Sequence, residues 1–159
     1  MAYKLKRATT KDMAALVQNR VEMLKEVYEL APEEDVSVLT QTTADFYKKH
    51  LADDSHVAYF AVDEAGEVAA TGGITFFALM PTPEDETGKR AFIMNLRTYA
   101  NHRRQGLGTL ILDALVNEAK QRNVTNIQIE ASKMGEKLYS HYGFAPMTYV
   151  MYLPKEKQS

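Results

Sequence analysis

The chain has 159 residues, of which 45% are hydrophobic and 25% are charged. This composition is typical of one globular domain with its own core, so we expect a single domain over residues 1–159. Its 19 basic and 21 acidic side chains leave a formal net charge of -2. That balance creates no broad positive field, which argues against a nucleic-acid or membrane partner.

The lack of cysteine excludes a further set of functions. Disulfide frameworks, thiolate zinc sites and mechanisms with a cysteine nucleophile all need that side chain. The 4 histidines do not fall at the spacing of helical metal ligands, and no HExxH motif occurs, so we predict no metal site. The N-terminal residues lack the apolar segment of a secretory signal, and we therefore expect a cytoplasmic protein.

Hydrophobic periodicity and turn residues predict the elements of the N-terminal half. Thr9 followed by Asp12 forms a weak capping box that starts a helix. Within this helix, Arg20 occupies a position where the apolar stripe expects a hydrophobic residue. Gly72 and Gly73 suggest a β-bulge in a strand. The predicted elements are a strand at 3–8, a helical stripe from 13 to 31, a helix at 43–52, and antiparallel strands at 57–62 and 68–79.

The C-terminal half contains the strongest helical stripe between two strands, which together predict a crossover unit. In the first of these strands, regular alternation places Phe92, Met94 and Leu96 on one side and Arg97 on the other. The predicted elements are a strand at 91–99, a helix from 107 to about 122, a strand at 126–131, a short helix at 134–142 and a final strand at 148–153. This order favours an α/β (α+β) fold with a mixed sheet and helices on both of its faces.

A glycine-containing turn joins the strand at 91–99 to the strongest helix. It reads Arg103-Arg104-Gln105-Gly106-Leu107-Gly108-Thr109. Glycines let the backbone lie close to a ligand, and the free N–H groups of a helix start favour a phosphate or pyrophosphate. Two arginines add positive charge beside it. A tight turn with solvated arginines is the alternative explanation of the same residues.

Two common nucleotide motifs fit this turn poorly. A Walker loop requires GxxxxGK followed by Ser or Thr, and the sequence has none. The dinucleotide fingerprint GxGxxG is approached at Gly106 and Gly108, with Glu130 at the end of the next strand. Ile111 stands where the third glycine permits close packing of helix on strand. This departure disfavours a nicotinamide enzyme.

The segment Arg103-x-x-Gly106-x-Gly108 resembles the acyl-CoA pyrophosphate loop of the GNAT superfamily of N-acetyltransferases. Two further segments match the family in position, namely Leu96-Arg97-Thr98 and Leu138-Tyr139-Ser140-His141-Tyr142-Gly143-Phe144. The specific motifs cover residues 91–145, and the order of elements covers nearly the whole chain. The resemblance implies a GNAT-like acyl-CoA N-acyltransferase fold, with a mixed, mostly antiparallel sheet that is splayed.

The resemblance also implies how a cosubstrate is bound and used. Acetyl-CoA would be attacked directly by an amine in a ternary complex, which agrees with the lack of a cysteine to carry the acyl group. Leu96, Arg97 and Thr98 would bind the pantetheine arm and donate to an oxyanion, while residues 103–109 hold the pyrophosphate. Ser132 is a further candidate cofactor contact. It stands where relatives often carry Asn, and Gly135 stands where Ala is common.

Catalytic residues follow from the same resemblance. Tyr139 matches the general-acid tyrosine, which would protonate the thiolate of coenzyme A. Tyr142 is predicted to be an ordinary helix-face aromatic, because it shares the apolar stripe of Leu138 and Tyr139 does not. Phe92 stands where relatives often carry a glutamate base. The carboxylates left as candidate bases are Glu130, Glu22 and Glu26, and a solvated side chain is the favoured explanation of each.

Charge gives an indication of the acceptor. Acidic side chains outnumber basic ones between Glu22 and Asp45, a region that borders the acceptor groove in the family. They would attract a cationic amine, although a solvated acidic surface explains them equally well.

We predict acetyl transfer to the primary amine of a small molecule. The alternatives are a protein N-terminal or lysine acetyltransferase and a non-catalytic acyl-CoA-binding regulatory module. Because family members are often dimers, a homodimer is also open.

Overall fold

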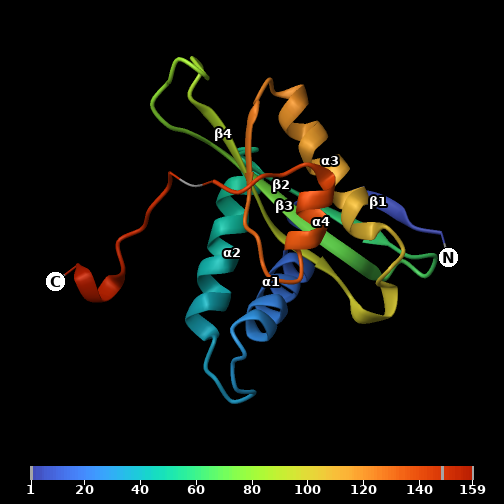
Figure 1. Cartoon of the computed structure of the whole chain (residues 1–159). Helices are drawn as coiled ribbons and strands as arrows, with labels where there is room; N and C mark the ends of the chain where they lie inside the picture. Colours follow the sequence, from blue (N-terminus) through green and yellow to red (C-terminus); the bar gives the residue numbers. More distant parts are fainter. Residues whose placement is uncertain (1, 148, 159) are drawn as a thin grey trace.

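The computed structural model describes residues 2–147 and 149–158. At its centre is a 5-stranded sheet with the order β1-β2-β3-β4-β5 (Figure 1). The strands are β1 (Lys4–Arg7), β2 (His56–Val62), β3 (Val68–Ala78), β4 (Lys89–Thr98) and β5 (Asn126–Ile129). Neighbouring strands are antiparallel except β4 and β5, which are parallel because the chain crosses between them through a helix.

Helices lie on both faces of this sheet. The helices α1 (Met13–Val27) and α2 (Ser37–Ala52) cover one face, and α3 (Leu107–Gln121) with the short α4 (Glu136–Tyr142) covers the other (Figure 1). The predicted mixed sheet with helices on both faces is confirmed. Three-residue turns of 3-10 helix occur at Thr10–Asp12, Ala100–His102 and Lys155–Lys157. In the described chain, every helix is too short or too polar to cross a membrane.

Each face of the sheet has its own apolar cluster. Alternation along β2 sends Val57 toward α3 and Ala58 toward α1 and α2. The predicted stripe of α3 is confirmed, because one side of this helix is buried against β2, β3 and β4. Its buried apolar residues are Leu107, Ile111, Leu112, Leu115, Val116 and Ala119. The cluster under α1 and α2 is smaller and is built around Leu16, Tyr47 and Phe60.

The first two helices differ in length from the prediction. The capping box is confirmed, since the Thr9 hydroxyl accepts from the Lys11 N–H and the Asp12 carboxylate accepts from the Thr9 N–H. However, α1 ends at Val27, because Glu29 adopts a φ of 51°. By contrast, α2 begins at Ser37, six residues before the predicted start at 43. The polar first turns of α2 concealed its start from a search for apolar periodicity.

The predicted bulge lies on β4 and not on the glycines of β3. Thr71 is opposite Arg97 and Gly73 is opposite Met94, so two residues of β4 face the single Gly72. The first of these two, Asn95, has a φ of 61° in the left-handed region. Asparagine is one of the few non-glycine residues that adopt this conformation readily. Gly72 instead admits α3, because a Cβ there would lie 2.5 Å from Cγ2 of Ile111.

This bulge shifts the alternation of side chains along β4. Leu96 packs with Ile93 against the α3 side of the sheet, whereas Met94 and Arg97 face α1 and α2. The prediction that groups Leu96 with Phe92 and Met94 is therefore wrong. One residue in the left-handed region changes which face the following side chains occupy.

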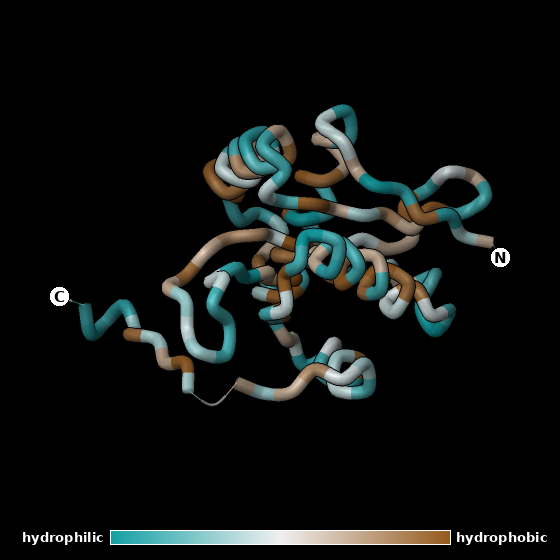
Figure 2. Tube along the Cα trace, turned by 90° about the horizontal axis from the view of Figure 1, so that it is seen from above, coloured by the Kyte–Doolittle hydropathy of each residue, from teal (hydrophilic) through white to brown (hydrophobic). Residues whose placement is uncertain are grey.

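The predicted final strand is not formed at residues 149–153, and Thr148 lies outside the described residues. These five residues are exposed although all are large and hydrophobic, and the segment leads away from the body of the protein (Figures 1 and 2). Their composition favours a strand, but a strand also requires a partner edge. Among the described residues, β5 pairs with β4 alone, and its other edge carries no strand.

Candidate active site

A gap between β4 and β5 begins in the middle of the sheet. The two strands pair only over Arg90–Ile93 and Asn126–Ile129, after which the Glu130 N–H donates to the Ile93 carbonyl at 3.0 Å. Beyond this point β4 continues along β3 to Thr98. In the described chain, Leu96, Arg97 and Thr98 thus have a strand on one side only. Their backbone lies beside an opening between two parallel strands, as the splayed sheet of the prediction requires.

The turn that follows β4 presents free backbone donors. Arg104 has a φ of 61° and Gly106 a φ of 74°, so the chain twice enters the left-handed region before α3 begins. No side chain caps α3, and among the described residues the N–H groups of 104–109 donate to no protein acceptor. Successive unpaired N–H groups at the start of a long helix form a site for an anion.

Side chains of this turn fall into two groups. Arg103, Arg104, Gln105 and Thr109 are exposed, and Arg103 Nε donates to the Thr98 carbonyl at 3.4 Å. Leu107 is buried in the core and anchors the start of α3. Positive charge therefore surrounds the free N–H groups while the helix beneath them is held in place.

The two glycines of the turn have different roles. Gly106 needs its freedom of conformation, since its φ is positive and a Cβ there would meet nothing within 4 Å. Gly108 instead makes room for α4, because a Cβ would lie 2.7 Å from Cδ2 of Leu138. A contact of Gly108 with a ligand stays a prediction, and the packing of α4 is a second reason for a glycine at this position.

Tyr139 lies on α4 next to the end of β5. It is 6% exposed and lines a pocket of about 410 Å³ together with Phe92, Ile129 and Phe144. Burial, with a smaller effect of the nearby Glu130 carboxylate, raises the pKa of the Tyr139 hydroxyl. The hydroxyl therefore stays protonated at neutral pH. Protonation is the state that a general acid requires.

The burial of the two tyrosines of α4 is the reverse of the prediction. Tyr139 is the more buried one, whereas Tyr142 is half-buried and donates to Asp113 at 2.7 Å. Burial and this hydrogen bond raise the pKa of Tyr142 to about 12. The prediction that Tyr139 lies off the buried stripe is wrong. Its neighbour Gly135 explains how it fits, because a Cβ there would lie 2.5 Å from the Tyr139 hydroxyl.

Ser132 builds the turn before α4. Its hydroxyl and its carbonyl both accept from the Gly135 N–H, and the carbonyl also accepts from the Glu136 N–H. These contacts give Ser132 a structural role at this position. Glu130, by comparison, is exposed directly after β5 and beside the gap.

The two glutamates of α1 that were candidate bases form ion pairs with one arginine. Arg97 Nη1 lies 3.0 Å from Glu22 Oε2, and Arg97 Nη2 lies 2.5 Å from Glu26 Oε1. Although partial burial opposes the shift, hydrogen bonds from Gln18, Arg97 and Tyr99 hold the pKa of Glu22 below its usual range. The lowered pKa makes Glu22 a poor base, and Glu26 is engaged by the same guanidinium group. The Arg97 side chain is directed to α1, which leaves its backbone as the part beside the gap.

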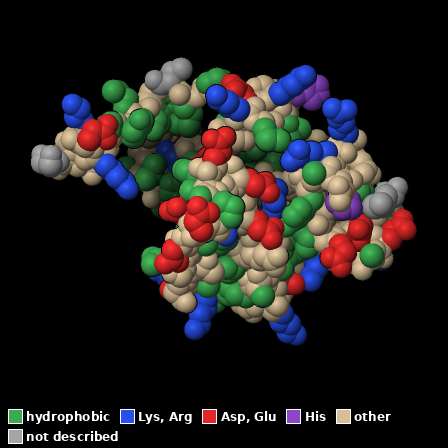
Figure 3. Space-filling view, turned by 90° about the horizontal axis from the view of Figure 1, so that it is seen from below, with side chains coloured by type: hydrophobic (Ala, Val, Ile, Leu, Met, Phe, Trp, Pro, Cys, Tyr) green, Lys and Arg blue, Asp and Glu red, His purple; other side chains and the backbone are tan. Residues whose placement is uncertain are grey.

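The other acids of this region lie in solvent. The connection between α1 and α2 is nearest to the viewer in Figure 3, where acidic side chains gather over it. Its exposed acids are Glu29, Glu33, Glu34 and Asp35. This placement favours the solvated acidic surface over a role in attracting a cationic amine.

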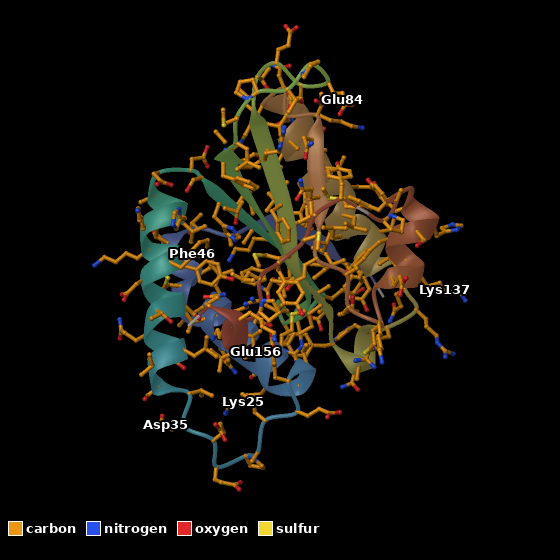
Figure 4. All side chains as sticks on the ribbon, turned by 60° about the vertical axis from the view of Figure 1, so that its left-hand side comes forward. Lys25, Asp35, Phe46, Glu84, Lys137 and Glu156 are labelled. Atoms are coloured by element: carbon orange, nitrogen blue, oxygen red, sulfur yellow. The ribbon has the colours of Figure 1, made fainter. Side chains whose placement is uncertain are left out.

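A second pocket, of about 230 Å³, lies on the α1 and α2 side of β4. Its wall includes Met94 and Asn95 at the bulge, so this pocket and the gap border the same stretch of β4. Phe46 projects into this region from α2 (Figure 4). Sequence reasoning did not identify this pocket, and its only signal was the irregular position of Arg20 on α1. The lining residues are Arg20, Leu24, Leu39, Thr42, Thr43, Phe46, Tyr47, His56, Met94 and Asn95.

Metal-binding side chains do not gather in the described part of the chain. Over residues 2–147 and 149–158, no three of His, Cys, Asp or Glu lie close enough together to hold a metal ion. The polar groups at the two openings are instead backbone N–H groups, a buried tyrosine and a pocket lining without acidic side chains.

Comparisons with known proteins identify similar chains. The model of the acetyltransferase (GNAT) family matches residues 22–144. A structure of a predicted acetyltransferase with acetyl-CoA from Clostridium acetobutylicum is 31% identical, covers 96% of each chain and has a TM-score of 0.87. A GCN5-related N-acetyltransferase from Ralstonia eutropha JMP134 is 23% identical, with 98% of this chain and 99% of that chain covered and a TM-score of 0.83. No sequence among the curated proteins is a significant match.

Proposed function

Because the chain belongs to the acetyltransferase (GNAT) family, we propose that it transfers the acetyl group of acetyl-CoA to the primary amine of a small molecule. The observation that carries this proposal is the pairing of two backbone features. The unpartnered N–H groups of residues 104–109 lie at the end of the strand whose residues 96–98 border the gap. Coenzyme A has a matching arrangement, because its diphosphate is directly connected to the arm that carries the thiol.

The residues present fit acetyl-CoA. The N–H groups at the start of α3 suit a diphosphate, and the exposed guanidinium groups of Arg103 and Arg104 add charge-assisted contacts. The gap beside Leu96 and Thr98 offers backbone groups to a pantetheine arm and to a thioester carbonyl. When bound, acetyl-CoA supplies the activated acetyl thioester and the thiolate leaving group.

Three of the chain's own groups carry the chemistry. Tyr139 holds a proton at neutral pH and delivers it to the departing sulfur, since its hydroxyl has a raised pKa and lies next to the end of β5. Backbone N–H groups of residues 96–98 stabilise negative charge on the carbonyl oxygen. We assign Glu130, exposed where β5 leaves β4, as the carboxylate that takes the ammonium proton through water. The amine then attacks directly, without an acyl-enzyme.

Release of free thiol from acetyl-CoA tests the proposal. We expect saturable thiol release that depends on an added primary amine, together with an acetylated product of matching mass. The control is the same assay without amine, which measures hydrolysis. Exchange of both Arg103 and Arg104 for Gln should weaken acetyl-CoA binding, whereas Lys11→Gln, on the opposite face, should not.

A non-catalytic acyl-CoA-binding module is the second candidate, because no carboxylate lines the pocket on the α1 and α2 side among the described residues. Saturable binding of acetyl-CoA with no amine-dependent thiol release across a panel of amines would support this module and contradict the enzyme. In that case Tyr139→Phe would change neither binding nor background hydrolysis.

A further inference from the structure

Arg20 differs from the other arginines that are shielded from water. In the part of the chain that the structure describes, Arg90, Arg97 and Arg122 each lie within ion-pair distance of a carboxylate. Arg20 is half-buried on α1, yet it forms no ion pair or hydrogen bond with a described residue. Partial burial of a charge without a partner costs free energy. An anion bound from outside the chain would offset this cost, and the position of Arg20 on an otherwise apolar stripe therefore points to an anion site.

The pocket that Arg20 lines contains two further unpaired groups. His56 is 4% exposed and Asn95 is 6% exposed. Among the described residues, His56 Nε2 and Asn95 Oδ1 have no hydrogen-bond partner. Buried polar atoms are nearly always paired in folded proteins. His56 Nε2 packs against Gly73, because a Cβ at that glycine would lie 2.6 Å from it. The unpaired atom that indicates a missing polar ligand is therefore Asn95 Oδ1. This observation is independent of the charge of Arg20.

The electrostatics of the pocket are one-sided. No described lining residue is acidic. Burial, followed in importance by the nearby His50 and Arg20, lowers the pKa of His56 to about 4, and burial raises the pKa of Tyr47 to about 12. Both side chains are uncharged at neutral pH. Arg20 is then the single charge in the described lining, and much of the remaining wall is apolar, formed by Leu24, Leu39, Phe46 and Met94.

We infer that the amine acceptor also carries a carboxylate and an apolar group, as an amino acid does, and that Arg20 binds this carboxylate. A guanidinium group matches a carboxylate with two parallel hydrogen bonds. Asn95 supplies a further polar contact, and Phe46 and Leu39 contact the apolar group. The inference rests on the proposed function, because it assigns the acceptor of the same reaction.

The position and size of the pocket agree with this acceptor. Met94 and Asn95 belong to the pocket and precede the residues that border the gap, so an amine held here faces the gap. A volume of about 230 Å³ suits a single amino acid better than a nucleotide or a drug-sized ligand, for which about 300 Å³ or more is usual. The cationic acceptor expected from the acids of α1 is not favoured, because Glu22 and Glu26 pair with Arg97.

The first test compares acceptors that differ only in the carboxylate. Thiol release from saturating acetyl-CoA is measured with L-phenylalanine, L-leucine and L-methionine and with their carboxamides, at one pH. The amino acids should give a KM about tenfold lower than the carboxamides, since a hydrogen-bonded ion pair is lost in the latter. Equal KM values, or a preference for the carboxamides or for a diamine, would overturn the inference.

The second test changes the pocket. Arg20→Gln should raise KM for the amino acids about tenfold and leave the carboxamides unchanged. Lys25→Gln, which removes the same charge from the same helix outside the pocket (Figure 4), should alter neither. If Arg20→Gln does not fold, Thr42→Glu introduces an acid at the exposed rim and should produce the same selective loss. An equal effect on both acceptor classes would contradict the inference.

Binding separates failure of the inference from failure of the proposed function. Isothermal calorimetry with L-phenylalanine alone should give heat with the wild type and with Lys25→Gln, but not with Arg20→Gln. If amino acids bind in this way without any thiol release, the proposed enzyme is contradicted while the pocket assignment stands. If thiol release occurs only with amines that lack a carboxylate, the enzyme stands and the pocket assignment is overturned.

Discussion

The two proposed sites lie on opposite sides of the sheet and are built from different groups. On the α3 side, the proposed acetyl-CoA site consists mainly of backbone groups in residues 96–98 and 104–109. On the α1 and α2 side, the proposed acceptor site consists of side chains from two helices and two strands, among them Arg20 and His56. A backbone site requires particular glycines and turns, which leave a short motif. A site made of scattered side chains leaves no contiguous motif, so only the folded chain identifies it.

The acid dependence of stability probes the acceptor side most strongly. His56 has a pKa of about 4 in the folded protein and about 6.5 when unfolded, so the unfolded chain takes up its proton first. Neutral His56 should contribute fully to the free energy of unfolding above pH 6.5. This contribution, about 3 kcal/mol, should be lost as the pH falls from about 6.5 to about 4. Urea unfolding across this range measures the loss. His56→Gln should flatten the slope, and His141→Gln, an exposed histidine on α4, should not.

Tyr139→Phe probes the α3 side. Removal of a general acid typically lowers kcat about 100-fold, and acetyl-CoA affinity should be retained because the ring stays in place. Steady-state thiol release and acetyl-CoA binding measure the two effects separately. Tyr142→Phe removes a hydroxyl from the same helix and should leave kcat unchanged. Equal rates for the wild type and Tyr139→Phe would remove this residue from the mechanism.

Gly106→Ala tests whether the backbone forms the diphosphate site. A φ of 74° costs a residue with a Cβ about 1–2 kcal/mol, so the turn should lose stability or change shape. Acetyl-CoA should bind more weakly, while KM for the amine is unchanged. Gly66, with a φ of 87° in the turn between β2 and β3, provides a matched control, since Gly66→Ala has similar strain away from the site. Equal loss of acetyl-CoA binding in both variants would contradict a local role for Gly106.

Thr9→Ala should have the smallest effect. It removes the capping box that leads into α1, and the expected loss is about 1 kcal/mol in the free energy of unfolding. Chemical denaturation measures this value. Thr10→Ala, at the next and equally exposed position, should be neutral. Acetyl-CoA binding should not change in either variant, because the box supports the acceptor side alone.

Sequence reasoning identified the fold where local signals agree with tertiary packing. The apolar stripe of α3 and the crossover to β5 were predicted, because one buried face fixes both periodicity and direction. The early end of α1 was missed, since it depends on the left-handed conformation of Glu29. The final strand was predicted wrongly at residues 149–153, because a strand pattern does not reveal whether a partner edge exists.

The candidate site was predictable where its residues are adjacent in the sequence, and not where its properties depend on contacts between distant elements. Residues 103–109 and Tyr139 belong to contiguous motifs, and the sequence named them. The neutral state of His56 and the pairing of Arg97 with Glu22 depend on contacts between elements far apart in the chain. Arg20 was recognised only as an irregularity of an apolar stripe. The role that we propose for Arg20 could be inferred only from the pocket that it lines in the folded chain.

The left-handed residue Asn95 allows one strand to serve two sites. Before it, Ile93 belongs to the core beneath α3, and after it Leu96 returns to that core one position out of step. Met94 and Asn95 are thereby left to the acceptor pocket, while the backbone of the next three residues borders the gap. If both proposed sites are correct, substitutions on α1 and α2 can change the choice of amine without changing the backbone groups that bind the acyl donor. Under this proposal, acceptor selectivity and thioester activation can change independently.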